Sequence, residues 1–274
     1  MSPTRLASAP NRFTAFSVPP EAGAGCVWGM SAMLGVTVNG EFHPVPPGGG
    51  AGGSGPMLVD WLRREARLTG VKVGCNAGAC GACTVMVTED GRDGGPPAHR
   101  PVLACLTPLA MVDGCSITTV EGLAGDGGEM HPIQRAFSDN QASQCGFCTP
   151  GQVMSLYTLL AKKPDATAAD IELALAGNLC RCTGYRTILN AAKRFASDAP
   201  SSAVECGGAA AAAAPRDSGF TGADGWSVPR SLRELCDAKR LDPAASIVAG
   251  GTALGLQRKK APSILCHLIR VTSR

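Results

Sequence analysis

The stretch Gly74-Cys75-Asn76-Ala77-Gly78-Ala79-Cys80-Gly81-Ala82-Cys83 decides how the first part of this chain folds. Its cysteines have the C-x4-C-x2-C spacing of plant-type [2Fe–2S] proteins, in which thiolates bind two irons. Cys105, in Ala104-Cys105-Leu106, is the expected fourth ligand because it can close the shell from a distant segment. The spacing therefore predicts one [2Fe–2S] cluster on this loop.

Glycine and alanine fill most of the positions between these cysteines. Small side chains let the backbone approach the sulfides, and its N–H groups can then hydrogen-bond to sulfur and tune the reduction potential. We expect a bulky side chain at Gly78 or Gly81 to push the loop away from the cluster.

A second cysteine set consists of Cys145 and Cys148 in Gln-Cys-Gly-Phe-Cys, and Cys180 and Cys182 in Leu-Cys-Arg-Cys. Apolar residues at helical spacing follow both pairs. These residues are Val153, Leu156, Tyr157 and Leu160, then Ile188, Ala192 and Phe195. Because helix N-termini carry partial positive charge, they favour an anionic cluster. The pattern predicts a second [2Fe–2S] cluster, held between helix starts.

Two other uses of paired cysteines compete with this interpretation. Structural zinc fits poorly, since the single residue between Cys180 and Cys182 is shorter than a zinc knuckle. A disulfide framework suits secreted proteins, yet the N-terminus lacks a clean pattern of charged, apolar and small residues typical of a secretory signal. The remaining cysteines have no partner at ligand spacing and are expected to be buried or free thiols: Cys26, Cys115, Cys206, Cys236 and Cys266. The histidines are scattered and predict no metal site: His43, His99, His131 and His267.

The pattern around the first loop predicts a β-grasp ferredoxin-like domain over 34–118. Asn39-Gly40 between two apolar runs indicates a hairpin, and a helix is expected from about Met57 with Leu68 on its apolar face. Further strands are expected over 84–88, 100–104 and 116–120. The fold class is thus α+β.

An all-α domain is predicted over 119–199. Helices are expected from Pro132, over 152–161, after a capping box at Thr167 and Asp170, and over 187–197. His131, directly before Pro132, marks the start of the first. Antiparallel packing of four such helices would form a four-helix bundle around the second cluster.

The remaining segments are expected to be a disordered extension over 1–33, a linker over 200–225, and the start of a further domain over 226–274. Of the extension's residues, only Arg5 and Arg12 are positively charged, so organellar targeting is weakly indicated and a cytoplasmic location is favoured. A net charge of +3 does not favour nucleic-acid binding, and no apolar run approaches a membrane span.

These motifs, with Gly177-Asn178-Leu179-Cys180-Arg181-Cys182-Thr183-Gly184-Tyr185-Arg186, strongly resemble the N-terminal part of the xanthine dehydrogenase/aldehyde oxidase family of molybdenum hydroxylases. The resemblance implies that Gln144 hydrogen-bonds the pterin of a molybdopterin cofactor. It also implies that a loop at the start of an FAD-binding domain, cut short at Arg274, runs along the flavin nucleotide. That loop is Ile247, Val248, Ala249, Gly250, Gly251, Thr252, Ala253 and Leu254.

In that family a purine, other heterocycle or aldehyde is hydroxylated at molybdenum, and two electrons leave through both clusters and FAD to NAD or O2. The resemblance implies that this chain is the electron-transfer portion of such an oxidoreductase, with FAD and molybdenum domains or subunits as partners, in a homodimer. No residue here is expected to perform the hydroxylation. Two alternatives stay open: a separate iron–sulfur small subunit, and a free ferredoxin-like carrier.

Overall fold

The computed structural model describes residues 34–45, 56–89, 95–125, 127–199, 226–227, 229, 231–248 and 268–270. The expected extension over 1–33 and linker over 200–225 lie outside these residues, as do 249–254 of the expected flavin loop. Within the described residues, no helix combines the length and the apolar character that crossing a membrane requires.

The first strands form the predicted hairpin. Strand β1 (Leu34–Val38) pairs antiparallel with β2 (Glu41–Val45), so that Val38 lies opposite Glu41. Asn39 and Gly40 connect them with φ of 50° and 89°. Positive φ at both central residues matches the twist of a two-residue hairpin, and asparagine followed by glycine tolerates it best.

A mixed five-stranded sheet has the order β2-β1-β5-β3-β4. Strand β3 (Thr84–Glu89) pairs antiparallel with β4 (Ala98–Leu103) and with β5 (Ser116–Thr118), whereas β5 runs parallel to β1. Two antiparallel arms joined by a central parallel pair agree with the β-grasp prediction. Helix α1 (Leu58–Arg64) directs Leu58, Trp61 and Leu62 into the core between itself and the sheet.

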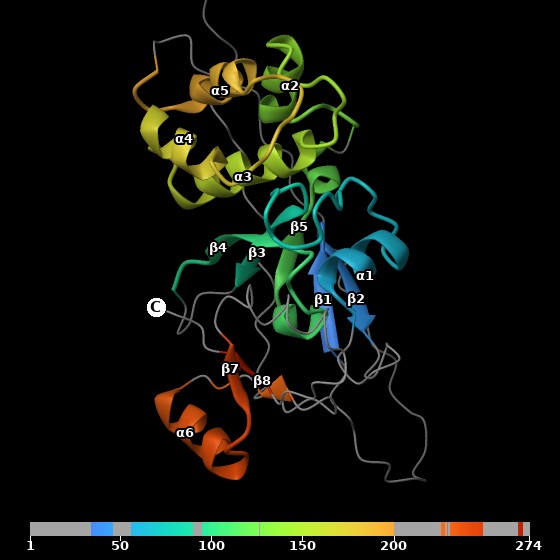
Figure 1. Cartoon of the computed structure of the whole chain (residues 1–274), viewed down its shortest axis with the longest axis vertical. Helices are drawn as coiled ribbons and strands as arrows, with labels where there is room; N and C mark the ends of the chain where they lie inside the picture. The colour runs from blue at the N-terminus through green and yellow to red at the C-terminus, as the bar shows by residue number, and fades with distance from the viewer. Residues whose placement is uncertain are drawn as a thin grey trace, which may run out of the picture. The chain divides into compact units, whose positions relative to one another are not determined.

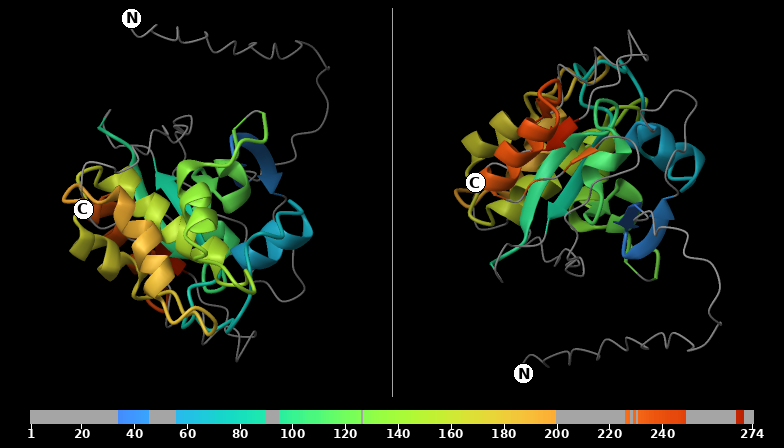
Figure 2. Two further views of the ribbon diagram at one scale, coloured as in Figure 1. Left: turned by 90° about the horizontal axis from the view of Figure 1, so that it is seen from above. Right: turned by 90° about the horizontal axis from the view of Figure 1, so that it is seen from below.

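Four helices make up the second part of the chain (Figure 1): α2 (Pro132–Asp139), α3 (Thr149–Lys162), α4 (Ala168–Leu175) and α5 (Arg186–Ala192). Helix α2 packs on α3 and α5, and α4 packs on α3 and α5. Figure 2 shows this group from above, with α3 to α5 in yellow to orange. Their apolar residues form a second core around Phe137, Leu156, Ile171 and Ile188.

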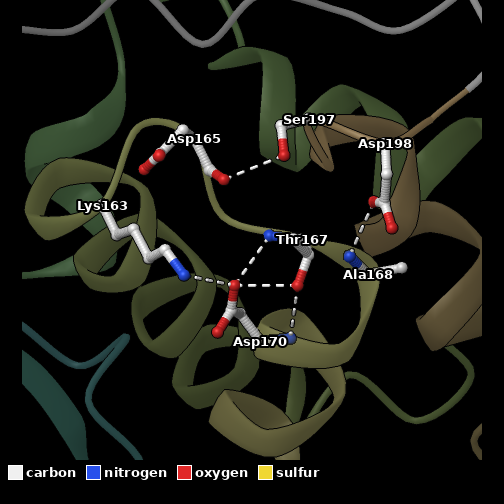
Figure 3. A network of polar contacts seen from close by, with 7 residues as sticks. All are labelled: Lys163, Asp165, Thr167, Ala168, Asp170, Ser197 and Asp198. Carbon is white, nitrogen blue, oxygen red and sulfur yellow. Dashed lines mark hydrogen bonds and ion pairs between the residues drawn. The ribbon is translucent and has the colours of Figure 1, made fainter.

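Local hydrogen bonds start two of these helices. The ring Nδ1 of His131 accepts from the Ile133 N–H, and Gln134 Oε1 accepts from the His131 N–H. The start of α4 is a capping box, as predicted: Thr167 Oγ1 accepts from the Asp170 N–H, and Asp170 Oδ2 accepts from the Thr167 N–H (Figure 3). Lys163 adds an ion pair to the Asp170 carboxylate. Each cap satisfies N–H groups that have no partner within the helix.

The two cores lie on the two faces of β3. Val85 and Val87 belong to the core under α1, whereas Met86 belongs to the core of the helices. Because successive side chains of a strand alternate between faces, β3 is buried on both. Helix α3 contacts β3 and β4 and covers this second face.

Several predicted boundaries differ from the observed ones. Helix α1 ends at Arg64, so Leu68 lies in the following loop, where its N–H donates to Leu62 O. The strand expected to reach Val120 ends at Thr118, because Val120 begins a 3-10 turn. Helix α3 begins three residues before Gln152, and α5 ends at Ala192 in a 3-10 turn over 193–195.

The described part of the tail forms a small parallel sheet of order β6-β8-β7. Strand β6 (Trp226–Ser227) is followed by α6 (Leu232–Leu241) and β7 (Ser246–Val248), and β8 (Leu268–Arg270) lies between the two strands. Ser231 Oγ caps α6 by accepting from the Glu234 N–H. A strand, a helix and a parallel strand make the start of an α/β unit.

Candidate metal centres

The first predicted quartet is brought together by the sheet. Cys83 directly precedes β3, and Cys105 lies two residues after the end of the paired strand β4; they are buried, at 2% and 1% exposure. Their thiols interact with each other, and Cys75 and Cys80 form a second interacting pair. The hydrogen bond with Cys105, together with burial, raises the pKa of the free Cys83 thiol. A metal would reverse this preference, because it binds thiolates.

The loop that carries Cys75 and Cys80 aims backbone N–H groups at sulfur. The N–H groups of Ala77 and Ala79 lie 3.4 and 3.2 Å from Cys75 Sγ. Burial acts to raise the pKa of Cys75, but these hydrogen bonds outweigh it and the pKa is lowered. Gly78 has φ of +72°, and a Cβ there would meet Leu106 Cδ1 at 2.3 Å. The loop thus needs glycine at this position for conformation and for space.

The second quartet lies at the start of α3. Cys148 is the N-cap residue of α3, and Cys145 precedes it in a loop. Cys145 Sγ lies 3.4 Å from Cys182 Sγ, and Cys148 hydrogen-bonds to Cys180. Burial, and then the bond with Cys180, raises the pKa of Cys148 to about 12. The helix start beside it supplies the partial positive charge that an anionic group favours.

Cys180 is buried, and its sulfur is held by neighbours. Thr183 contacts it through its hydroxyl at 3.2 Å and its N–H at 3.5 Å. Burial acts to raise the pKa of Cys180, but the two Thr183 contacts lower it overall. The Cys180 N–H donates to the Tyr185 hydroxyl at 3.0 Å. Tyr185 is the N-cap residue of α5 and has a left-handed backbone, with φ of 69°.

The thiols of each set lie in pairs, as the ligands of a binuclear cluster do. In the described residues no three His, Cys, Asp or Glu side chains converge as the ligands of one ion do. The thiols meet instead in four pairs: Cys75 with Cys80, Cys83 with Cys105, Cys145 with Cys182, and Cys148 with Cys180. A [2Fe–2S] cluster takes two thiolates on each iron, so two pairs suit one cluster.

The two centres adjoin each other. The Leu179 N–H, directly before Cys180, donates to the Cys80 carbonyl at 2.9 Å. A Cβ built on Gly74 would lie 3.4 Å from the ring of Phe147, so the second motif also touches the first loop. One end of the second quartet is open, because Cys145 and Cys182 are exposed.

Other predicted site residues lie apart from this junction or outside the described residues. Gln144 is exposed directly beside Cys145. Ile247 is exposed in β7, which also contains Val248. The rest of the predicted flavin loop, 249–254, lies outside the described residues. Cys115 is buried and Cys236 is exposed, as expected for thiols outside the quartets.

Two polar residues at the junction were missed by sequence reasoning. Asn178 and Ser155 are buried at 4% and 7% exposure and hydrogen-bond to each other. Asn178 lies within the motif before Cys180, but nothing in its spacing indicates a partner. The only signal at Ser155 is a small polar residue on the apolar face of a helix.

Comparison with known proteins places both quartets in recognised domains. Residues 54–110 match the family described as 2Fe-2S iron-sulfur cluster binding domain, and residues 119–193 match the [2Fe-2S] binding domain family. Aldehyde oxidase 1 of Cavia porcellus is 43% identical over 195 residues, which cover 70% of this chain. Xanthine dehydrogenase of Drosophila subobscura is 36% identical over 259 residues, covering 78% of this chain. The chain spans 14% and 19% of the length of these two relatives.

Solved structures agree with the sequence relatives. Aldehyde oxidoreductase from Desulfovibrio gigas aligns with a TM-score of 0.51 and 37% identity, over 60% of this chain and 16% of that one. Both the sequence and the fold of the cysteine-bearing region are therefore shared with these oxidoreductases. The chain belongs to the xanthine dehydrogenase/aldehyde oxidase family, of which it contains the two [2Fe–2S] binding domains.

Proposed function

We propose that this chain passes electrons from a molybdenum cofactor, through two [2Fe–2S] clusters, to FAD in a xanthine dehydrogenase/aldehyde oxidase-like hydroxylase. Cys145, Cys148, Cys180 and Cys182 would bind the cluster near molybdenum, and Cys75, Cys80, Cys83 and Cys105 the cluster near the flavin. The observation that carries this proposal is the meeting of the eight thiols as four pairs in two adjoining sites.

Each cluster supplies one-electron chemistry, and the protein controls where the charge is held. The N–H groups of Ala77 and Ala79 point at Cys75 Sγ, so they stabilise the negative charge that reduction adds. Thr183 has the same role at Cys180. Burial of Cys83, Cys105 and Cys180 keeps water from that side of each cluster. The exposed Cys145 and Cys182 leave one side open to a donor.

The partners follow from the same proposal. The exposed Gln144 beside Cys145 would hydrogen-bond the pterin of the molybdopterin cofactor, on the open side of the second site. The parallel strands of the tail, with α6 between β6 and β7, support its interpretation as the start of an FAD-binding domain. Residues 247–254 would then contact the flavin nucleotide. The whole enzyme would be a cytoplasmic homodimer.

The domain division follows the two cores. We place a plant-type ferredoxin domain at 34–118 and a four-helix-bundle cluster domain at 119–199, which the separate cores under α1 and around α3 support. The extension over 1–33, the linker over 200–225 and the flavin-domain fragment over 226–274 complete the proposed organisation.

Metal and sulfide analysis tests the proposal. Anaerobically purified chain should contain about four irons and four acid-labile sulfides, since each [2Fe–2S] cluster has two of each. After reduction, it should give two distinguishable EPR signals, because one site lies on a sheet loop and the other at a helix start. Stoichiometric zinc without acid-labile sulfide would contradict the proposal.

A further inference from the structure

The side chain of Asn178 connects two sites that are far apart in sequence. Its Nδ2 donates to the carbonyl of Gly81, in the first cysteine loop, at 3.0 Å. Its Oδ1 accepts from Ser155 Oγ, in the middle of α3, at 2.8 Å. Both hydrogen bonds are buried. One amide therefore ties the segment before Cys180 to the first loop and to α3.

The backbones around Asn178 approach each other closely. A Cβ on Gly81 would lie 2.5 Å from Gly177 O and 2.6 Å from Asn178 Nδ2. A Cβ on Gly151, in the first turn of α3, would lie 2.3 Å from Gly81 O. The Leu179 N–H donates to Cys80 O one residue further on. Three segments thus approach closely enough at Gly81 and Gly151 that an added Cβ would clash with backbone, and a small shift of one segment must move another.

We propose that Asn178, oriented by Ser155, is a positioning residue that fixes the separation of the two clusters. The inference rests on the proposed function, since it needs both quartets to hold clusters. With both clusters bound, one electron would pass from the cluster held by the second quartet, so that this cluster is oxidised, to the cluster held by the first quartet, so that this one is reduced. No bond forms or breaks, and Asn178 itself is not oxidised or reduced.

The chemistry of the amide explains why this residue suits the position. The Gly81 carbonyl needs a donor and the Ser155 hydroxyl here donates, and an amide supplies both the N–H and the oxygen that this arrangement uses. Leucine has similar size but removes both hydrogen bonds, so that Gly81 O keeps its two bonds from Thr84 while Ser155 Oγ loses this acceptor in a buried site. Fully satisfied buried networks hold their members in one arrangement. Because electron tunnelling falls steeply with distance, such rigidity matters for the transfer rate.

Asn178→Leu in the full cluster-loaded chain tests the inference through two readouts. The first is the spin–spin splitting of the EPR signals of the fully reduced protein, which depends on the separation of the clusters. The second is hydrogen–deuterium exchange of the peptide containing the Leu179 amide, read by mass spectrometry. We expect a smaller or broadened splitting with both clusters retained, and exchange about tenfold faster.

A matched control is Asn140→Leu, because Asn140 Nδ2 donates only to Ala136 O within the same helix region. It should change neither readout. If Asn178→Leu does not take up clusters, the same measurements are made on Ser155→Ala. This variant removes the hydrogen bond to Asn178 Oδ1 and so frees the amide to rotate. Wild-type splitting and exchange in the cluster-loaded variant would overturn the inference and leave the proposed function intact. If the wild-type chain does not hold two clusters, both the inference and the proposed function are wrong.

Discussion

Gly151→Ala tests the close contact between α3 and the first cysteine loop. Gly151 lies in the first turn of α3, so helix propensity alone predicts a gain of up to ~1 kcal/mol from alanine. The structure predicts the opposite. The new Cβ would lie 2.3 Å from Gly81 O and 3.0 Å from Ala82 Cα, both backbone atoms that cannot rotate away.

The magnitude follows from what the Gly81 carbonyl does. It would have to move by at least ~0.7 Å to relieve the contact, a displacement of the kind that costs about 1–3 kcal/mol in packed cores. The same oxygen accepts hydrogen bonds from Asn178 Nδ2, Thr84 Oγ1 and the Thr84 N–H, at 3.0, 2.7 and 3.2 Å. Weakening them adds roughly 0.5–1.5 kcal/mol per lost bond. After the propensity gain, we expect a net loss of about 1–3 kcal/mol.

The assay is the rate of cluster loss in denaturant, followed anaerobically by the visible absorbance of the clusters. If the contact is already broken in the transition state for unfolding, a loss of about 1–3 kcal/mol speeds bleaching roughly 5- to 150-fold. Gly177→Ala is the control, since a Cβ there meets nothing within 4 Å. Its rate should stay within about twofold of wild type. A Gly151→Ala variant that bleaches as slowly as wild type would refute the reasoning.

Three further predictions address the sites and the caps. Cys80→Ser should remove only the EPR signal of the sheet site, and Cys148→Ser only that of the helical site, because each quartet is closed within itself; loss of both signals from a folded variant would contradict this. Thr167→Ala should destabilise α4 by about 0.5–2 kcal/mol, read as faster exchange of the α4 amides, and unchanged exchange there would count against it. Burial lowers the pKa of His131, whose neutral Nδ1 caps α2. The cap therefore contributes fully to stability above the unfolded pKa of ~6.5, and this contribution is lost as the pH falls below that value. His131→Asn should keep the cap and remove this part of the pH dependence of the bleaching rate.

Features decided by neighbours in the chain could be predicted from the sequence. The Asn39-Gly40 turn, the Thr167 capping box and the His131-Pro132 helix start each depend on residues within a few positions of one another. The pairing of Val38 with Glu41 and the caps at His131 and Thr167 form inside the segment that contains them. The grouping of eight cysteines into two quartets was also visible, because cluster chemistry restricts the spacing of its ligands.

Features decided by distant contacts could not be predicted. The hydrophobic pattern of β3 reads as an ordinary strand, yet Met86 belongs to the core of the helices because α3 covers that face. Helix α1 ends at Arg64, and the Arg63 guanidinium donates to the carbonyls of Thr69 and Val71 in the segment that follows. Such contacts form only when the chain folds, so the apolar spacing that placed Leu68 on this helix was misleading.

The junction of the two sites shows the same division most clearly. The sequence by itself predicted which cysteines form each set and which loop positions require small side chains, because both depend on residues within each motif. Only the tertiary structure decided how the sets meet. Asn178 and Gly81 are 97 positions apart, and Asn178 and Ser155 are 23 apart. A hydrogen bond over that separation exists because folding excludes water from both partners, and no local spacing encodes it.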